Sequence, residues 1–303
     1  MVDAAGMQER YQDWTVDFGG PAGEPALLPP DSVQWRIYKN PIALAIGGVA
    51  AVLLEFADPR IRSGVWNHSV YPTDPIGRSK RTGLAALIAC YGPASAAQAV
   101  IGRINQMHAK VKGVTPGGEA YRALDPELLD WVAATAAFGF LTAYDEYVSP
   151  VSAADKDRFF RDGAAIDRAF GARHTPASLA EFDAMAQRLE PRFEPHPIIG
   201  EFLAIIQSGK AASGVPRFVH RALAQAAVGL LPVAVRRKLE LGPEYDLGWF
   251  ERLALKALGR LADRKVTPGS PPCRASERLG LPADFLYLPP DRQRALLMRQ
   301  SQG

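Results

Sequence analysis

Apolar residues along this chain recur mostly at intervals of three and four, the spacing of one face of an α-helix. In the stretch from residue 77 to residue 90, for example, Leu84, Leu87 and Ile88 fall on a single helical face. Alternation of apolar and polar residues, the mark of a half-buried strand, does not extend over a useful length anywhere in the sequence. The pattern therefore predicts an all-α fold.

Helix starts are marked by a capping side chain followed by proline, whose missing N–H costs nothing in the first helical turn. Asn40-Pro41 and Asp125-Pro126 carry this signal and predict helices over residues 41–56 and 126–148. Asp58-Pro59 is interpreted as a helix stop, with a loop over residues 60–75. Further helices are expected at residues 77–90, 95–111, 152–170, 176–190, 196–208, 215–229 and 246–263. The Thr-Pro-Gly-Gly sequence at residues 115–118 favours one short hairpin.

The chain is expected to form a single large helical domain of roughly nine to eleven helices, because 303 residues can bury a substantial core. This domain covers residues 41–265. Residues 1–40 contain a Pro- and Gly-rich stretch and are interpreted as an N-terminal arm lying on the body. Residues 266–303 are interpreted as a Pro-rich C-terminal extension with a short terminal helix.

Composition narrows the partners and the compartment. The net charge of +3 is too small for a nucleic-acid-binding protein, so no nucleic acid is expected. Cys90 and Cys273 are the only cysteines, which fits a reducing compartment and a cytoplasmic location. No basic segment followed by an apolar run opens the sequence, so no signal peptide is expected. The apolar run at residues 42–54 is too short to span a bilayer and predicts a buried helix, with peripheral membrane association as the alternative.

Several catalytic motifs are absent from the sequence. It contains no GxGxxG after a strand, no GxxxxGK[ST], no GxSxG and no HExxH. What remains are isolated polar residues on apolar helices, which is how helical bundles build cofactor sites.

Arg78, Arg81 and Thr82 share one face of a predicted helix, because positions three and four apart are neighbours. Planar guanidinium groups bind carboxylates through parallel N–H bonds, so this face suits haem propionates or an acidic substrate. The adjacent Lys80 leaves a second interpretation open, a basic helix start that simply faces solvent.

Two further groups carry candidate chemistry. His108 closes a predicted helix, where an imidazole is either a helix-end residue favoured by the backbone dipole or a metal ligand. Trp131, Thr135 and Phe138 recur at helical spacing on the helix that follows, among small residues that allow close approach to the backbone. That approach is made either by another helix or by a flat ligand.

These groups lie in segments that resemble the MpaB-type and rubber-oxygenase family, also described as DUF2236. Residues 74–82 (DPIGRSKRT) are similar to its DPxxRxxRT element, residues 104–113 (INQMHAKVKG) to its HxxVxG element, and residues 121–135 (YRALDPELLDWVAAT) to its YxAxDPELLxWVHAT element. Upstream, residues 53–71 resemble its HPxVxxxVxxHSxF stretch. The elements occur in order, and the resemblance covers residues 40 to 240.

The resemblance implies a helical domain with an internal cofactor cavity and, in the rubber oxygenases, haem b. The histidine of the HxxVxG element, the proximal iron ligand there, falls on His108. The polar residues near the haem fall on Arg78, Arg81 and Thr82. The implied chemistry is dioxygen-dependent cleavage of carbon–carbon double bonds in isoprenoid chains.

Three positions depart from the family pattern. Ala133 and Asp58 stand where histidines are common. Arg81 replaces a lysine that can occupy the distal iron position, and arginine holds its proton too tightly to coordinate iron. An open or water-filled distal site is therefore expected, with His68 as another candidate ligand there.

The leading hypothesis is a haem-dependent oxygenase that acts on an apolar, isoprenoid-like small molecule. His108 is expected to bind the iron, and Arg78, Arg81 and Thr82 to act in the reaction. A cavity wall is expected from Trp131, Thr135 and Phe138. The alternative is a helical protein without cofactor or catalysis that binds a lipid or terpenoid. A non-haem metal enzyme is the third hypothesis, disfavoured because the sequence lacks convergent ligand spacing.

Overall fold

The computed structural model describes residues 16–68, 74–209 and 216–300. The first part of the expected N-terminal arm, the end of the expected loop, the first residue of the helix expected at 215–229 and the last three residues lie outside the described ranges.

The described residues confirm the all-α prediction, with fourteen α-helices where nine to eleven were expected. Their only sheet is a two-stranded hairpin, β1 (Lys112–Val114) and β2 (Ala120–Arg122), which confirms the predicted hairpin. Three short 3₁₀ turns, η1 (Glu190–Arg192), η2 (Pro243–Tyr245) and η3 (Phe285–Tyr287), link helices. The helices are α1 (Val33–Tyr38), α2 (Pro41–Ala57), α3 (Pro59–His68), α4 (Pro75–Tyr91), α5 (Ala94–His108), α6 (Pro126–Tyr147), α7 (Ala153–Phe170), α8 (Leu179–Leu189), α9 (Pro197–Gln207), α10 (Arg217–Leu230), α11 (Val233–Lys238), α12 (Trp249–Arg264), α13 (Pro271–Arg278) and α14 (Pro290–Gln300).

The capping signals explain where the main helices begin. The Asn40 side chain accepts hydrogen bonds from the backbone N–H groups of Ile42 and Ala43, at 3.0 and 3.1 Å. At the start of α6, the Asp125 carboxylate accepts from the N–H of Glu127 at 2.9 Å. Each side chain satisfies donors that have no partner inside the helix.

The prediction of a loop at residues 60–75 is wrong over its first half, where the chain forms α3. Asp58-Pro59 ends α2 and also starts α3, because its carboxylate accepts from the backbone N–H of Arg60 at 2.9 Å. The same pair of residue types had indicated helix starts elsewhere in the sequence. The signal was therefore present, but it was interpreted only as a stop.

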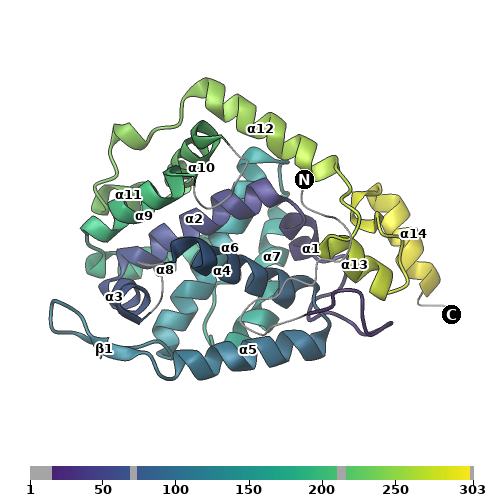
Figure 1. The fold of residues 1–303 in the computed structure, drawn as a ribbon, viewed down its shortest axis with the longest axis horizontal. Helices are drawn as coiled ribbons and strands as arrows, with labels where there is room; N and C mark the ends of the chain where they lie inside the picture. The colour runs from purple at the N-terminus through teal and green to yellow at the C-terminus, as the bar shows by residue number, and fades with distance from the viewer. Residues whose placement is uncertain (1–15, 69–73, 210–215, 301–303) are drawn as a thin grey trace.

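The centre of the fold is the crossing of α2 and α6, which pack together more extensively than any other pair of helices and lie in the middle of the molecule (Figure 1). A Cβ atom on Gly47 would lie 2.7 Å from the carbonyl oxygen of Gly139, and one on Gly139 would lie 2.4 Å from that of Gly47. Further along, the indole N–H of Trp131 donates to the Leu54 carbonyl at 3.1 Å. Residue numbers rise along α2 as they fall along α6, so the two helices run antiparallel.

A second apolar cluster joins the two ends of the described chain to α4 and α5. Arg278 of α13 is buried there, and its guanidinium donates to the carbonyls of Phe18, Glu24 and Tyr91 at 2.6, 2.8 and 2.9 Å. Three backbone acceptors satisfy the buried cation, so this contact fastens the N-terminal segment to the C-terminal helices.

Among the described residues, no single helix is long and apolar enough to cross a membrane. The pair α2 and α3 passes the same criterion together, but it is bent by 110° at the junction. Ten residues of α2 are buried within the protein.

We predict that Gly47→Ala and Gly139→Ala each lower the free energy of unfolding by about 1–3 kcal/mol, because the added methyl meets backbone that does not yield. Gly48→Ala is the matched control. Its Cβ would meet only a Phe140 ring carbon at 3.8 Å, so removing glycine from the helix stabilises by about 0.5–1 kcal/mol. Denaturant unfolding followed by circular dichroism measures all three, and equal effects at Gly47 and Gly48 would contradict the close crossing.

Candidate functional site

Four helices bring together the candidate site, which consists of Glu55 of α2, Arg78 of α4, His108 of α5 and Thr135 of α6. The charge of Arg78 acts on both Glu55 and His108, and Thr135 hydrogen bonds with the Glu55 side chain. Three of these four residues were predicted from the sequence. The fourth, Glu55, was not.

His108 occupies the last position of α5, where its side chain is half-buried. Burial lowers its pKa below the ordinary value, and the positive charge of Arg78 lowers it further. The imidazole is therefore neutral near pH 7. Its Nδ1 atom is buried and has no hydrogen-bond partner among the described residues. A buried polar atom without a partner is costly, and such atoms often mark a functional position.

Glu55 is the only charged residue of α2, a helix that otherwise reads PIALAIGGVAAVLL before it. Burial raises its pKa to about 7, although Arg78 and the hydrogen bond with Thr135 act in the opposite direction. The carboxyl group therefore exchanges a proton near physiological pH. A single acidic residue at the end of a long apolar run was the signal available in the sequence, although Glu55 was not among the predicted site residues.

Thr135 is completely buried, and its hydroxyl donates to the Val132 carbonyl at 2.9 Å. Its side chain also hydrogen bonds with Glu55, and this bond favours the ionised form of the acid. Burial acts more strongly and favours the neutral form.

Trp131 and Phe138, on the same helix, stack on Phe182 of α8. The ring centroids are 5.7 Å apart for Trp131 and 4.2 Å apart for Phe138, with interplanar angles of 12° and 11°. These rings belong to the main core cluster. They fix α6 against α8, while Thr135 forms the contact of α6 with the site.

On α4, Arg78 and Thr82 bond to one another one turn apart. The guanidinium donates to the Thr82 hydroxyl oxygen, and the hydroxyl lies 3.1 Å from the Arg78 carbonyl that it can donate to. Arg81 is half-buried and lies 3.8 Å from Asp74, the residue that caps the helix. Arg78 is thus bonded to Thr82, whereas the Arg81 guanidinium lies near Asp74, the N-cap residue of α4.

The two positions nearest the family's upstream histidines have other partners. Asp58 is buried in a two-pronged ion pair with Arg60, with contacts of 2.7 and 3.0 Å. His68 lies at the end of α3, where its Nε2 is 3.1 Å from the Tyr121 hydroxyl. Both pairs tie α3 to its surroundings.

Over the described ranges, no three His, Cys, Asp or Glu residues converge as a metal-binding group. His108 thus belongs to no cluster of three or more protein ligands within the described ranges. A lone imidazole does not make an iron site from protein ligands alone, but it is sufficient where a porphyrin provides the other nitrogens.

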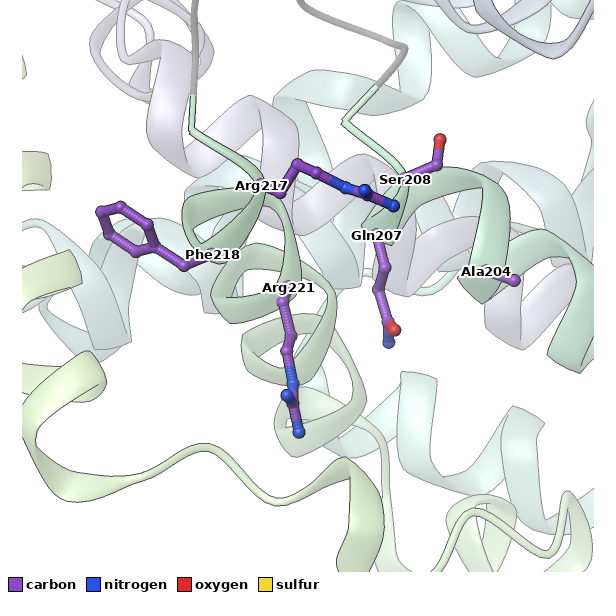
Figure 2. A pocket seen from close by; sticks show the side chains of 6 residues that line it. All are labelled: Ala204, Gln207, Ser208, Arg217, Phe218 and Arg221. Carbon is purple, nitrogen blue, oxygen red and sulfur yellow. The ribbon is translucent and has the colours of Figure 1, made fainter.

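A surface pocket of roughly 450 Å³ lies elsewhere, between α9 and α10 (Figure 2). Arg217, Phe218 and Arg221 project from α10 (Figure 2). The Phe218 side chain points away from Gln207 of α9 (Figure 2). It contains none of the candidate site residues. The chemistry argued from the four helices therefore does not extend to this pocket.

We predict that Glu55→Gln changes how stability depends on pH. The folded protein keeps the Glu55 proton to about pH 7, whereas the unfolded chain releases it near pH 4.5, so burial of this group costs stability progressively as the pH rises between these values. The variant should match the wild type near pH 4.5 and exceed it by about 2–4 kcal/mol above pH 7. Denaturant titrations across this range measure the difference. Glu201→Gln, at an exposed position on α9, is the control, and parallel curves for wild type and Glu55→Gln would contradict the shift.

We also predict that Arg78→Gln raises the pKa of both Glu55 and His108. The positive charge of Arg78 stabilises the Glu55 carboxylate and destabilises the protonated His108 imidazole, so removing it raises both pKa values. NMR titration of the histidine signals follows His108, with the spectrum of His108→Ala for assignment. Lys80→Gln, on the exposed side of the same helix, is the control. A shift of equal size in the control would show that the effect is not local.

The chain was also compared with known protein families, curated proteins and solved structures. Residues 35–264 match the family model described as "ER-bound oxygenase mpaB/B'/Rubber oxygenase, catalytic domain". Comparisons with curated proteins and with solved structures gave no match. The matched range is well over half of the chain and contains Glu55, Arg78, His108 and Thr135. The chain therefore belongs to the MpaB and rubber oxygenase family.

Proposed function

We propose that this protein is a haem-dependent oxygenase acting on an apolar, isoprenoid-like small molecule. The observation that carries the proposal is His108, a half-buried and neutral imidazole whose buried Nδ1 has no partner among the described residues. Neutral imidazole is the form that binds iron, and histidine is the usual protein ligand of haem. Membership of an oxygenase family supports the reaction class.

The donor set fits haem b better than other iron cofactors. His108 would provide one nitrogen ligand, and the porphyrin would provide the other nitrogens. Arg78 and Arg81 come from one face of α4 and are suited to the two propionates, because guanidinium groups bind carboxylates through parallel hydrogen bonds. When bound, haem supplies the activation of dioxygen, and the protein supplies orientation and electrostatics.

The polar groups beside the imidazole have separate tasks in this proposal. Thr82, bonded to Arg78, orients the guanidinium and provides a hydroxyl for hydrogen bonding to the reacting molecule. On the α6 side, Thr135 contacts the site, and the stacking of Trp131 and Phe138 on Phe182 holds the helix rigid. An apolar substrate suits these surroundings, since aromatic rings bury large apolar surfaces.

Glu55 is the proton carrier of the site. A group whose pKa of about 7 matches the working pH both releases and accepts a proton readily, which is the requirement for general acid–base catalysis. Arg78 and the hydrogen bond with Thr135 stabilise the ionised form when the proton leaves.

The distal side of the haem is proposed to be open or filled by water. Burial lowers the pKa of Arg81, but arginine remains protonated in proteins and offers no lone pair to iron. His68 hydrogen bonds with Tyr121, so its ring is engaged at the hairpin. An open position is what a cofactor needs to bind dioxygen.

His108→Ala tests the proposal directly. After reconstitution with hemin, the wild type is expected to show a Soret band, and the variant to retain about tenfold less haem or to show a shifted band that added imidazole restores. His174→Ala is the matched control, because that side chain is 85% exposed. Absence of a Soret band in the folded wild type contradicts haem binding and favours the cofactor-less, lipid-binding alternative. Full haem occupancy in His108→Ala contradicts the ligand assignment.

A further inference from the structure

Helix α12 packs on the protein through a side that carries both apolar and charged residues. Its buried residues are Leu255 and Gly259, and the Gly259 carbonyl accepts from the Asn40 side chain at 2.9 Å. Arg252 and Lys256 are partly buried and lie 2.9 and 3.0 Å from the Glu146 carboxylate. The charged groups that normally face solvent on an amphipathic helix are thus used against the bundle.

The opposite side of the helix is apolar and exposed. At 100° per residue, its members fall on one continuous face. The side chains of Trp249, Phe250, Leu253 and Leu261 are 63%, 66%, 56% and 65% exposed. We name this set the outer α12 face, which consists of Trp249, Phe250, Leu253, Ala254, Ala257, Leu258 and Leu261.

The outer α12 face lies at the periphery of the molecule. In Figure 1, α12 runs along the top edge, opposite to α5 at the bottom. The whole apolar face stays exposed, and a contiguous apolar patch of this kind marks an interaction surface more often than chance exposure.

We propose that the outer α12 face docks this protein on an anionic lipid membrane, with α12 lying in the plane of the interface. Cations accompany the apolar face. Arg260, Arg264 and Lys265 are exposed along the C-terminal half of the helix and just beyond it, and none forms an ion pair with a described residue. Arg260 and Arg264 fall on the same side of the helix as Trp249 and Leu253. Such cations bind anionic headgroups, while the apolar side chains enter the acyl boundary, as in interfacial helices.

The aromatic pair at the start of α12 suits the same occupant. The rings of Trp249 and Phe250 stack with their centroids 3.6 Å apart, and both are exposed. Tryptophan concentrates at the boundary between headgroups and acyl chains, where its ring is buried and its N–H stays hydrated. The two rings are therefore expected to insert at this depth of the bilayer.

The size of the face argues against a second copy of the chain. Sixteen helical residues span about 24 Å, and a helix is about 10 Å wide, so the face offers roughly 240 Å². A stable protein–protein interface needs about 800 Å² from each partner. A bilayer needs no shape complementarity and accepts a single helix. This inference stands independently of the proposed oxygenase function.

Vesicle cosedimentation with the full chain tests the proposal. The protein is expected to bind vesicles made of equal parts phosphatidylcholine and phosphatidylglycerol, and to bind pure phosphatidylcholine vesicles far more weakly. The combined variant Phe250→Gln, Leu253→Gln and Leu261→Gln should bind the anionic vesicles about tenfold less or weaker. Replacing Arg260, Arg264 and Lys265 by Gln should weaken binding about fivefold per charge at low salt.

Val114→Gln in the hairpin is the matched control, because Val114 is 60% exposed and belongs to a different element, far from α12 in Figure 1. Circular dichroism checks that each variant is folded. Failure of the folded wild type to bind either vesicle overturns the proposal. A dimer in light scattering that the apolar variant abolishes overturns it in favour of a second copy.

Fluorescence quenching gives a readout at the residue itself. Lipids brominated near the headgroup should quench part of the tryptophan emission of the wild type on anionic vesicles, and Trp249→Phe should remove that quenched part. Trp35 and Trp131 are buried and serve as internal references. Quenching that survives in Trp249→Phe would place the membrane contact away from α12.

Discussion

The contact between Gly47 and Gly139 is the constraint on which the rest of this structure depends. A Cβ atom at either position would lie 2.4 to 2.7 Å from the carbonyl oxygen of the other helix, so α2 and α6 meet backbone to backbone. Such close contact fixes the rotation of each helix about its axis. With that rotation set, Glu55 of α2 meets Thr135 of α6, and Trp131 reaches the Leu54 carbonyl. The candidate site thus rests on two residues that have no side chain.

Burial and one cation together set the protonation of the site. Burial opposes charge on any group, which raises the pKa of a carboxyl and lowers that of an imidazole. Glu55 and His108 are therefore both shifted toward neutrality near pH 7. The positive charge of Arg78 lowers both pKa values. It therefore opposes the effect of burial on Glu55 and adds to the effect of burial on His108. The result is an uncharged donor nitrogen and a carboxyl group that exchanges a proton near pH 7, both under the influence of the Arg78 charge.

The same chain places its apolar residues in two different ways. In α2 and α6 they turn inward and close the core, while in α12 most of them turn outward, and Leu255 is buried between Arg252 and Lys256 on the packed side. Glu146 makes this reversal possible, since it pairs with both Arg252 and Lys256 at the packed side of α12. Pairing offsets part of the cost of partly burying these cations, and the outer α12 face is left for an apolar surface such as a lipid interface.

The sequence by itself determined the helical class, most helix starts and the position of His108 at a helix end. These properties depend on neighbouring residues, namely apolar spacing and the pairing of a capping side chain with proline. Asp58-Pro59 shows the limit of local rules, because the same residues end α2 and begin α3. Only the tertiary structure decided that Glu55 joins Arg78 and His108, that its pKa rises to about 7, and that Trp131 and Phe138 stack on Phe182. Burial and electrostatic coupling arise between residues far apart in the sequence, and they exist only once α2, α4, α5 and α6 have packed together.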